Sequence, residues 1–149
     1  KRDPDVEFSF YGGGDQIANI EGQKTPNLKY CGRLKRADIA AAMSGYQLAI
    51  MPYKIDELSH AFCHIKLFEY WERGLPVLAT HSRENENIGN LFFFKTADDL
   101  LKHISDYRND PSVFLDSARE GRKRVETKYN WDLLTQQYLS VLEEAVAVK

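Results

Sequence analysis

The stretch that decides the fold runs from residue 64 to residue 80 and reads HIKLFEYWERGLPVLAT. Its first ten residues, His64 to Arg73, have the spacing of a helix, and Gly74 stands where a helix C-terminal cap is expected. The next run, 76–79, opens with a proline that a helix cannot continue through and is otherwise apolar. Such a run suits a strand covered on both faces, as in parallel sheets flanked by helices. The stretch therefore predicts a helix followed directly by a buried strand.

Short apolar strands alternate with helical patterns on both sides of this stretch. Strands separated by helices indicate crossover connections and a mostly parallel open sheet. The predicted class is α/β, a Rossmann-like open sheet with helices on both faces. The predicted strands are 6–11, 27–31, 48–51, 76–79 and 91–94, the first two helices are 35–44 and 64–73, and residues 82–90 are expected to form a polar loop.

Three helices are predicted to end the chain. Thr96 and Asp99 have the spacing of a capping box, with Asp in place of Glu. Asp110 and Pro111 open the second helix, because proline is favoured in a first helical turn. Asn130 is a suitable N-cap for a terminal helix over 131–149.

Composition and charge exclude several classes of protein. There are 20 Lys and Arg against 22 Asp and Glu, a formal net charge of −2, so no global basic field indicates a nucleic-acid partner. The longest apolar runs, such as Leu91 to Phe94, are far too short to cross a bilayer. The two cysteines, Cys31 and Cys63, stand in unrelated contexts, which is typical of reduced thiols. We therefore expect a cytoplasmic protein of one domain.

The start of helix 64–73 is the candidate binding site. Ligands of open parallel sheets bind at the carboxyl ends of the strands, where a helix N-terminus presents free N–H groups and a partial positive charge. Lys66 adds a full charge where a diphosphate would rest, and Glu69, one turn deeper, can accept hydrogen bonds from two adjacent ribose hydroxyls. Ile65, Phe68 and Trp71 are expected to point toward the sheet.

The alternative is a row of solvent-exposed ion pairs, Lys66–Glu69–Arg73, in which each pair would stabilise the helix by a few tenths of a kcal/mol. Spacing alone favours this row of ion pairs, because charged helix faces are common.

A family resemblance favours the binding site. Lys66-Leu67-Phe68-Glu69-Tyr70 with Gly74-Leu75-Pro76-Val77 resembles the K-x-x-E-Y-x-x-x-G-x-P-V run of the C-terminal, donor-binding domain of GT-B glycosyltransferases, of the group 1 or family 4 type. Residues 10–14, 28–34 and 48–53 resemble further strand ends of that domain, so the similarity covers almost the whole chain.

The resemblance implies a role for each matching position. Lys66 would contact the donor diphosphate and Glu69 the ribose, while the backbone at Arg33 and Leu34 would meet the base. Gly12 and Gly13 would keep the neighbouring loop close, and Ser59 to Cys63 would bring loop and helix-start N–H groups to phosphate and sugar. The implied donor-binding set is Lys66, Glu69, Gly12, Gly13, Arg33, Leu34, Tyr53, Ser59, His60 and Cys63, with no metal, no cofactor and no assigned catalytic residue.

Two departures from the family pattern narrow the expectation. Many retaining members carry a second Glu eight residues before the ribose-binding one, where this chain has Ala61. It is therefore more similar to variants that keep only the Lys and the Glu. The chain also begins after the expected first strand and without the N-terminal acceptor-binding domain, so we expect residues 1–149 to be a single nucleotide-sugar-binding domain with no transferase activity of its own.

The expected function is the donor half of a hexosyl- or glycuronosyltransferase. It would bind a UDP- or GDP-sugar for transfer to a glycan or lipid-linked acceptor in polysaccharide or glycoconjugate biosynthesis, with peripheral contact to the inner face of the membrane left open. A non-catalytic Rossmann-like binding or regulatory module and half of a sugar-nucleotide epimerase remain as alternatives. A zinc site at His60, Cys63 and His64 is disfavoured, because no second pair has zinc spacing.

Overall fold

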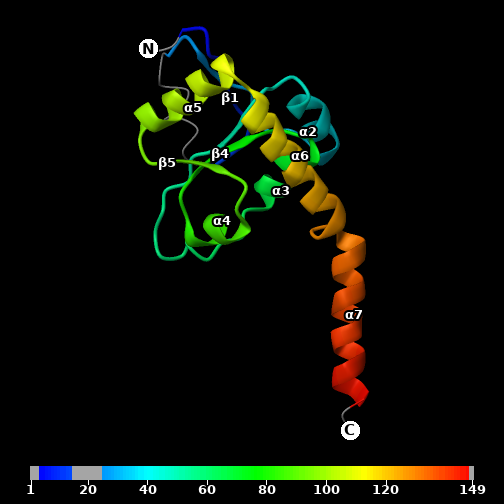
Figure 1. Ribbon diagram of the computed structural model, residues 1–149. Coiled ribbons are helices and arrows are strands. Elements are labelled where there is room, and N and C mark those ends of the chain that lie inside the picture. The colour runs from blue at the N-terminus through cyan, green and yellow to red at the C-terminus, as the bar shows by residue number, and fades with distance from the viewer. Residues whose placement is uncertain (1–3, 15–24, 148–149) are drawn as a thin grey trace. The chain divides into compact units, whose positions relative to one another are not determined.

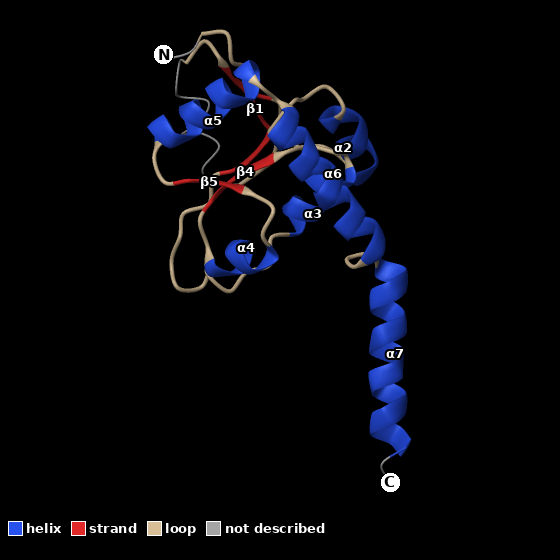
Figure 2. Cartoon of the chain, viewed as in Figure 1, coloured by secondary structure: helices blue, strands red, loops and turns tan. Residues whose placement is uncertain are grey.

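The computed structural model describes residues 4–14 and 25–147, and the chain divides into two compact units, residues 1–45 and residues 46–149. Figure 1 shows the elements in chain order, and Figure 2 shows short strands with helices around them. In the smaller unit, β1 (Phe8–Phe10) and β2 (Leu28–Tyr30) pair in parallel, and α2 (Arg36–Met43) follows.

The larger unit contains a three-stranded parallel sheet in the order β3-β4-β5. Helix α3 lies between β3 and β4 in the chain, and α4 lies between β4 and β5, so each pair of neighbouring strands is joined through a helix. The α/β, Rossmann-like class is confirmed, although the strands form two open sheets where one was expected. The elements are β3 (Ala49–Met51), α3 (Ile65–Glu72), β4 (Val77–Thr80), α4 (Arg83–Ile88), β5 (Phe92–Phe94), α5 (Ala97–Asn109), α6 (Ser112–Thr127) and α7 (Trp131–Ala147).

The core of the larger unit is built around β4, the central strand. Val77, Leu78 and Ala79 have no exposed surface, which confirms the strand predicted from its continuous apolar run. Helix α3 contributes Leu67 and Trp71, both completely buried. Further buried side chains come from the flanking strands and from α5 and α6, namely Ala49, Met51, Phe94, Ile104, Phe114 and Ala118.

The buried face of α3 differs from the predicted one. We expected Ile65, Phe68 and Trp71 to point toward the sheet, but Ile65 is 69% exposed and Leu67 is buried in its place. Leu67 and Trp71 are four residues apart and therefore stack on one face, whereas Ile65 is the first residue of the helix and has no preceding turn to pack against. Phe68 is half-buried, with its ring 4.7 Å from that of Tyr129.

Residues 82–90 were predicted to be a loop, and this prediction is wrong. Residues 83–88 form α4, whose N-cap Ser82 accepts a hydrogen bond from the Asn85 N–H at 3.1 Å. The acidic residues of the segment lie in the first turn, where the helix dipole favours them, and Asn85 and Ile88 are buried. The sequence does contain a signal for a short helix that the prediction overlooked, namely a serine suited to an N-cap followed seven residues later by Gly89, which has a φ of 69°.

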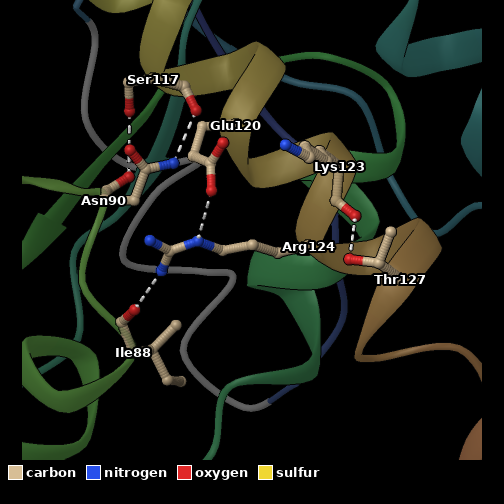
Figure 3. A network of polar contacts seen from close by, with 7 residues as sticks. All are labelled: Ile88, Asn90, Ser117, Glu120, Lys123, Arg124 and Thr127. Atoms are coloured by element: carbon tan, nitrogen blue, oxygen red, sulfur yellow. Dashed lines mark hydrogen bonds and ion pairs between the residues drawn. The ribbon is translucent and has the colours of Figure 1, made fainter.

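Helix α6 holds the turn between α4 and β5 in place (Figure 3). Asn90 adopts a φ of 63°, and its amide donates to the Ser117 carbonyl at 2.6 Å while the Ser117 hydroxyl donates to the Asn90 carbonyl at 3.0 Å. Two turns further on, the Arg124 guanidinium donates to the Ile88 carbonyl at 2.7 Å and pairs with Glu120 at 3.2 Å. These bonds stabilise a backbone conformation that a non-glycine residue rarely adopts.

The predicted helix ends are largely confirmed. Gly74 has a φ of 70°, as a left-handed cap residue requires, and Thr96 and Asp99 form the reciprocal capping box. The Asn130 side chain accepts from the Leu133 N–H at 2.9 Å at the start of α7. No residue of α7 is buried.

Candidate functional site

The start of α3 lies at the carboxyl-terminal edge of the β3-β4-β5 sheet. This position follows from the topology, because the chain leaves β3 at Met51, enters α3 at Ile65 and returns along the parallel strand β4. Lys66 and Glu69 are both accessible there, with side-chain exposures of 47% and 28%. The two side chains therefore sit at the rim where parallel sheets bind ligands.

Lys66 and Glu69 form an ion pair across one helical turn. The Lys66 Nζ is 2.6 Å from Glu69 Oε2, an exposed pair of the kind that contributes up to about 1 kcal/mol. The Lys66–Glu69 contact of the alternative row of ion pairs is therefore present, but Arg73 does not extend it, because its guanidinium pairs with Glu72 at 3.1 Å. The pair stands apart as one cation and one carboxylate presented together.

Tyr53 lies beside this pair, just beyond β3. Burial raises the pKa of the Tyr53 phenol, Lys66 opposes the shift and Glu69 adds to it, so both charged groups lie within electrostatic reach of the ring. The ring stacks on His64, the N-cap residue of α3, with centroids 4.1 Å apart and planes 6° from parallel. Thr80, at the end of β4, donates its hydroxyl to the Tyr53 carbonyl at 2.9 Å. The aromatic pair is thereby attached to the sheet edge.

His64 is held by packing more than by hydrogen bonds. Its Nε2 is buried and has no hydrogen-bond partner in the described part of the chain. Burial lowers the pKa of the imidazole, which favours the neutral ring. A neutral ring loses less solvation than a charged one when it stacks on Tyr53.

The loop before α3 is closed by a turn from Asp56 to Ser59. The Ser59 N–H donates to Asp56 Oδ1 at 2.8 Å, and its hydroxyl donates to the Asp56 carbonyl at 2.9 Å while accepting the Asp56 N–H at 2.6 Å. These bonds hold the pKa of the Asp56 carboxyl below its usual value, the bond from the Ser59 N–H having the largest effect. Ser59 is buried and uses both donors within the loop, so its part in the predicted site is to shape the backbone.

Within the predicted stretch Ser59–Cys63, the backbone donors that remain open in the described part of the chain lie at its end. The N–H groups of His60 and Ala61 are used within the loop, donating to Asp56 and Leu58. Among the described residues, none accepts a hydrogen bond from the N–H of Phe62 or of Cys63, and both residues are exposed. The structure therefore narrows the predicted N–H donors from Ser59–Cys63 to these two and the first turn of α3.

The remaining side chains of the loop have distinct positions. His60 faces α4 and accepts the Arg83 N–H on its Nδ1 at 3.2 Å. Burial, and then the Glu84 carboxylate, raise the pKa of the Cys63 thiol, so it is mostly protonated at neutral pH. In the described part of the chain, no three His, Cys, Asp or Glu side chains lie together as a metal site would need. This finding includes His60, Cys63 and His64.

The other predicted residues belong to the smaller unit. The loops after β1 and β2 are joined by a bond from the Gly12 N–H to the Gly32 carbonyl at 3.0 Å and by one from the Tyr30 hydroxyl to the Gly12 carbonyl at 2.9 Å. The exposed Arg33 side chain crosses Gly13 so closely that a Cβ there would lie 2.7 Å from Arg33 Cδ. The close approach of the Arg33 side chain to Gly13 leaves no room for a side chain at position 13 unless Arg33 moves. Leu34, the next residue, is half-buried.

Sequence reasoning missed two residues that organise this edge of the sheet. Thr80 holds the Tyr53 carbonyl and Asp56 nucleates the loop turn. Asp56 was recoverable, because an Asx residue three before a serine is typical of such turns. Thr80 was not, because its partner is 27 residues away.

The family comparison agrees with this geometry. Residues 1–140 match the model of the family described as glycosyl transferase-like. The chain belongs to that family. Membership covers nearly the whole sequence, supports the resemblance to GT-B glycosyltransferases, and makes glycosyl transfer the general chemistry of this family member.

No curated protein matches this glycosyl transferase-like chain. Within residues 4–14 and 25–147, none of the helices combines the length and apolar character needed to cross a membrane.

Proposed function

We propose that this chain binds a sugar donor activated by a nucleoside diphosphate, UDP or GDP, at the start of α3. The observation that carries the proposal is the Lys66–Glu69 pair, accessible at the carboxyl-terminal rim of a parallel sheet in a chain of the glycosyl transferase-like family. A cation and a carboxylate one turn apart match a diphosphate and a pentose with adjacent hydroxyls.

In this proposal, different residues bind different chemical groups of the donor. Lys66 supplies positive charge to the diphosphate, and the open N–H groups of Phe62 and Cys63 add neutral donors beside it. Glu69 accepts from the ribose hydroxyls once Lys66 has turned to the phosphate. Such donors stabilise the negative charge that develops on the departing nucleoside diphosphate. In this proposal they do so without a metal or cofactor.

Transfer itself requires a second domain. We propose that the acceptor binds to an N-terminal half of the Rossmann type, and that this chain acts as the donor half of a hexosyl- or glycuronosyltransferase that builds polysaccharides or glycoconjugates. Acceptor and donor must be brought together in a closed cleft from which water is excluded. The 149-residue chain alone should therefore show no sugar transfer, and transfer by it would contradict this division of labour.

Calorimetric titration with UDP and GDP tests the donor site. We expect binding in the micromolar-to-millimolar range by one of them, weakened roughly 10- to 100-fold by Lys66→Ala, because hydrogen bonds to charged groups contribute about 1.5–3 kcal/mol. Glu69→Ala should weaken binding over a similar range. Arg73→Ala is the matched control, since it removes a charge from the same helix and should leave the affinity unchanged.

Truncated ligands separate the two roles. The Lys66→Ala effect should vanish with the bare nucleoside, and the Glu69→Ala effect should vanish with a 2′,3′-dideoxy diphosphate. If neither UDP nor GDP binds, or if Arg73→Ala costs as much affinity as Lys66→Ala, the proposal is wrong.

A further inference from the structure

The loop that precedes α3 is fastened to α4 through His60. The His60 Nδ1 accepts the N–H of Arg83 at 3.2 Å, and the His60 carbonyl accepts the N–H of Glu84 at 3.1 Å. These are the first two N–H groups of α4, which have no partner within the helix. With Ser82 capping the Asn85 N–H, the first three N–H groups of α4 all have partners, and two of the three bonds come from His60, 23 positions before the first residue of the helix.

The bond from Arg83 requires a neutral imidazole. A ring nitrogen accepts a hydrogen bond only when it carries no proton, so the neutral His60 ring has its proton on Nε2. Protonation would place an N–H at Nδ1 directly opposite the N–H of Arg83. The bond would be lost and the ring would have to turn away from α4.

The contact between His60 and α4 restrains the loop segment that contains the Phe62 and Cys63 N–H groups. Ala61, Phe62 and Cys63 are all exposed and connect two held histidines, His60 on α4 and His64 on Tyr53. Three residues between fixed ends have little freedom, so the direction of the Phe62 and Cys63 N–H groups depends on where His60 is held. Lys66 follows in the first turn of α3, so the position of His60 also bears on the charged pair.

We propose that His60 is a positioning residue for the donor diphosphate, holding the Phe62 and Cys63 N–H groups in place only while its ring is neutral. The inference rests on the proposed function, because it concerns how the same site is kept in shape. His60 itself touches no donor atom. Donor affinity therefore falls when His60 is protonated, although the charge at Lys66 is unchanged.

The two segments joined by His60 contain further charged and titratable groups. From α4 come the Arg83 guanidinium and the Glu84 carboxylate, and from its own loop come Asp56 and the Cys63 thiol. Asp56 is committed to its turn with Ser59, and Cys63 is mostly protonated at neutral pH. The pH-dependent step assigned to His60 must therefore be isolated by substitution and not by pH alone.

The variant His60→Asn isolates the pH-dependent step at residue 60. The asparagine Oδ1 falls close to the position of the histidine Nδ1, accepts a hydrogen bond and has no proton to gain near neutrality. His60→Ala removes the acceptor and leaves the backbone bond to Glu84. All three chains contain the same His64, Cys63 and Glu84, so differences between them report on residue 60.

The first readout needs no ligand. Amide hydrogen exchange at Arg83 is compared at about pH 7.5 and about pH 5, with each rate corrected for the intrinsic effect of pH. We expect the wild-type protein to lose protection at the lower pH, His60→Asn to keep it at both, and His60→Ala to lack it at both. Protection in the wild-type protein that does not change with pH would overturn the proposal.

The second readout is UDP or GDP affinity, whichever binds, at the same two pH values. We expect the wild-type affinity to fall about 3- to 10-fold further than that of His60→Asn, the range of one neutral hydrogen bond, with His60→Ala weak at both. Equal pH profiles for wild-type and His60→Asn, or full affinity in a folded His60→Ala, would refute the positioning role. Absence of all nucleotide binding would instead refute the proposed function, while the exchange measurement still decides whether His60 fastens the loop.

Discussion

A single methyl group placed at Gly121 tests how α3 and α6 are packed. Gly121 is buried in the middle of α6, and a Cβ built there would lie 2.5 Å from the Cδ1, Cγ and Nε1 atoms of Trp71. Trp71 is completely buried, so its ring cannot swing into solvent. Its Nε1 has no hydrogen-bond partner among the described residues, which leaves packing alone to hold the ring.

Two opposing effects set the magnitude for Gly121→Ala. Alanine is about 1 kcal/mol more favourable than glycine in a helix interior. Overpacking a core costs about 1–3 kcal/mol, and three rigid ring atoms at 2.5 Å place this site at the upper end of that range. We therefore expect a net loss of about 2 kcal/mol in the free energy of unfolding, which for a chain of this size lowers Tm by about 4–8 °C.

Thermal and urea denaturation followed by circular dichroism measure this loss. Gly45→Ala is the matched control, because its Cβ would enter open space and the same chemical change should be almost neutral. Trp71→Phe removes Nε1 and leaves a smaller ring with room to shift away from residue 121, so the double variant should be more stable than the sum of the single changes by about 1 kcal/mol or more. An unchanged or raised stability for Gly121→Ala, or additive changes in the double variant, would refute the packing argument.

Two smaller predictions concern the α4–β5 turn and the start of α5. Asn90→Ala should cost about 2 kcal/mol in urea denaturation, one part for a left-handed φ and one for the lost amide bond to Ser117, whereas Asn90→Gly should cost about half as much; equal losses would contradict this division. The pKa of Asp99 is held below its usual value, first by the Lys95 N–H and then by Thr96, so its contribution to stability is complete above about pH 4 and is lost as the pH falls through the lowered value. The stability gap between wild-type and Asp99→Asn should therefore shrink in acid, and a gap that stays constant from neutral pH to about pH 2 would show that ionisation is not its source.

Local signals in the sequence predicted most of the elements. The apolar run before Thr80 identified the central strand, Gly74 marked the end of α3, and Thr96 with Asp99 marked the start of α5. These features depend on backbone conformations and hydrogen bonds within a few residues, so they are legible without the fold. The polar composition of 83–88 misled us, because a six-residue helix carries too few apolar positions to show a period.

The sequence predicted only part of the candidate site. Spacing alone favoured a row of solvent-exposed ion pairs, and the family resemblance pointed to Lys66 and Glu69 as a binding site. The structure presents both side chains at the sheet edge. Their accessibility, the burial of Ser59 and the exposure of Ile65 depend on which segments pack against them. No local pattern contains that information, because burial is set by neighbours that are distant in the chain.

What the sequence by itself determined is the order of the strands and of the helices other than α4, most of the helix caps, and the placing of a lysine and a glutamate on one turn of α3. Only the tertiary structure decided that His60 turns to α4, that Trp71 rests on Gly121, and that Thr80 holds Tyr53. The members of these pairs lie 23, 50 and 27 residues apart. Propensity acts over one or two turns, whereas such partners meet only after the sheet has brought their elements side by side.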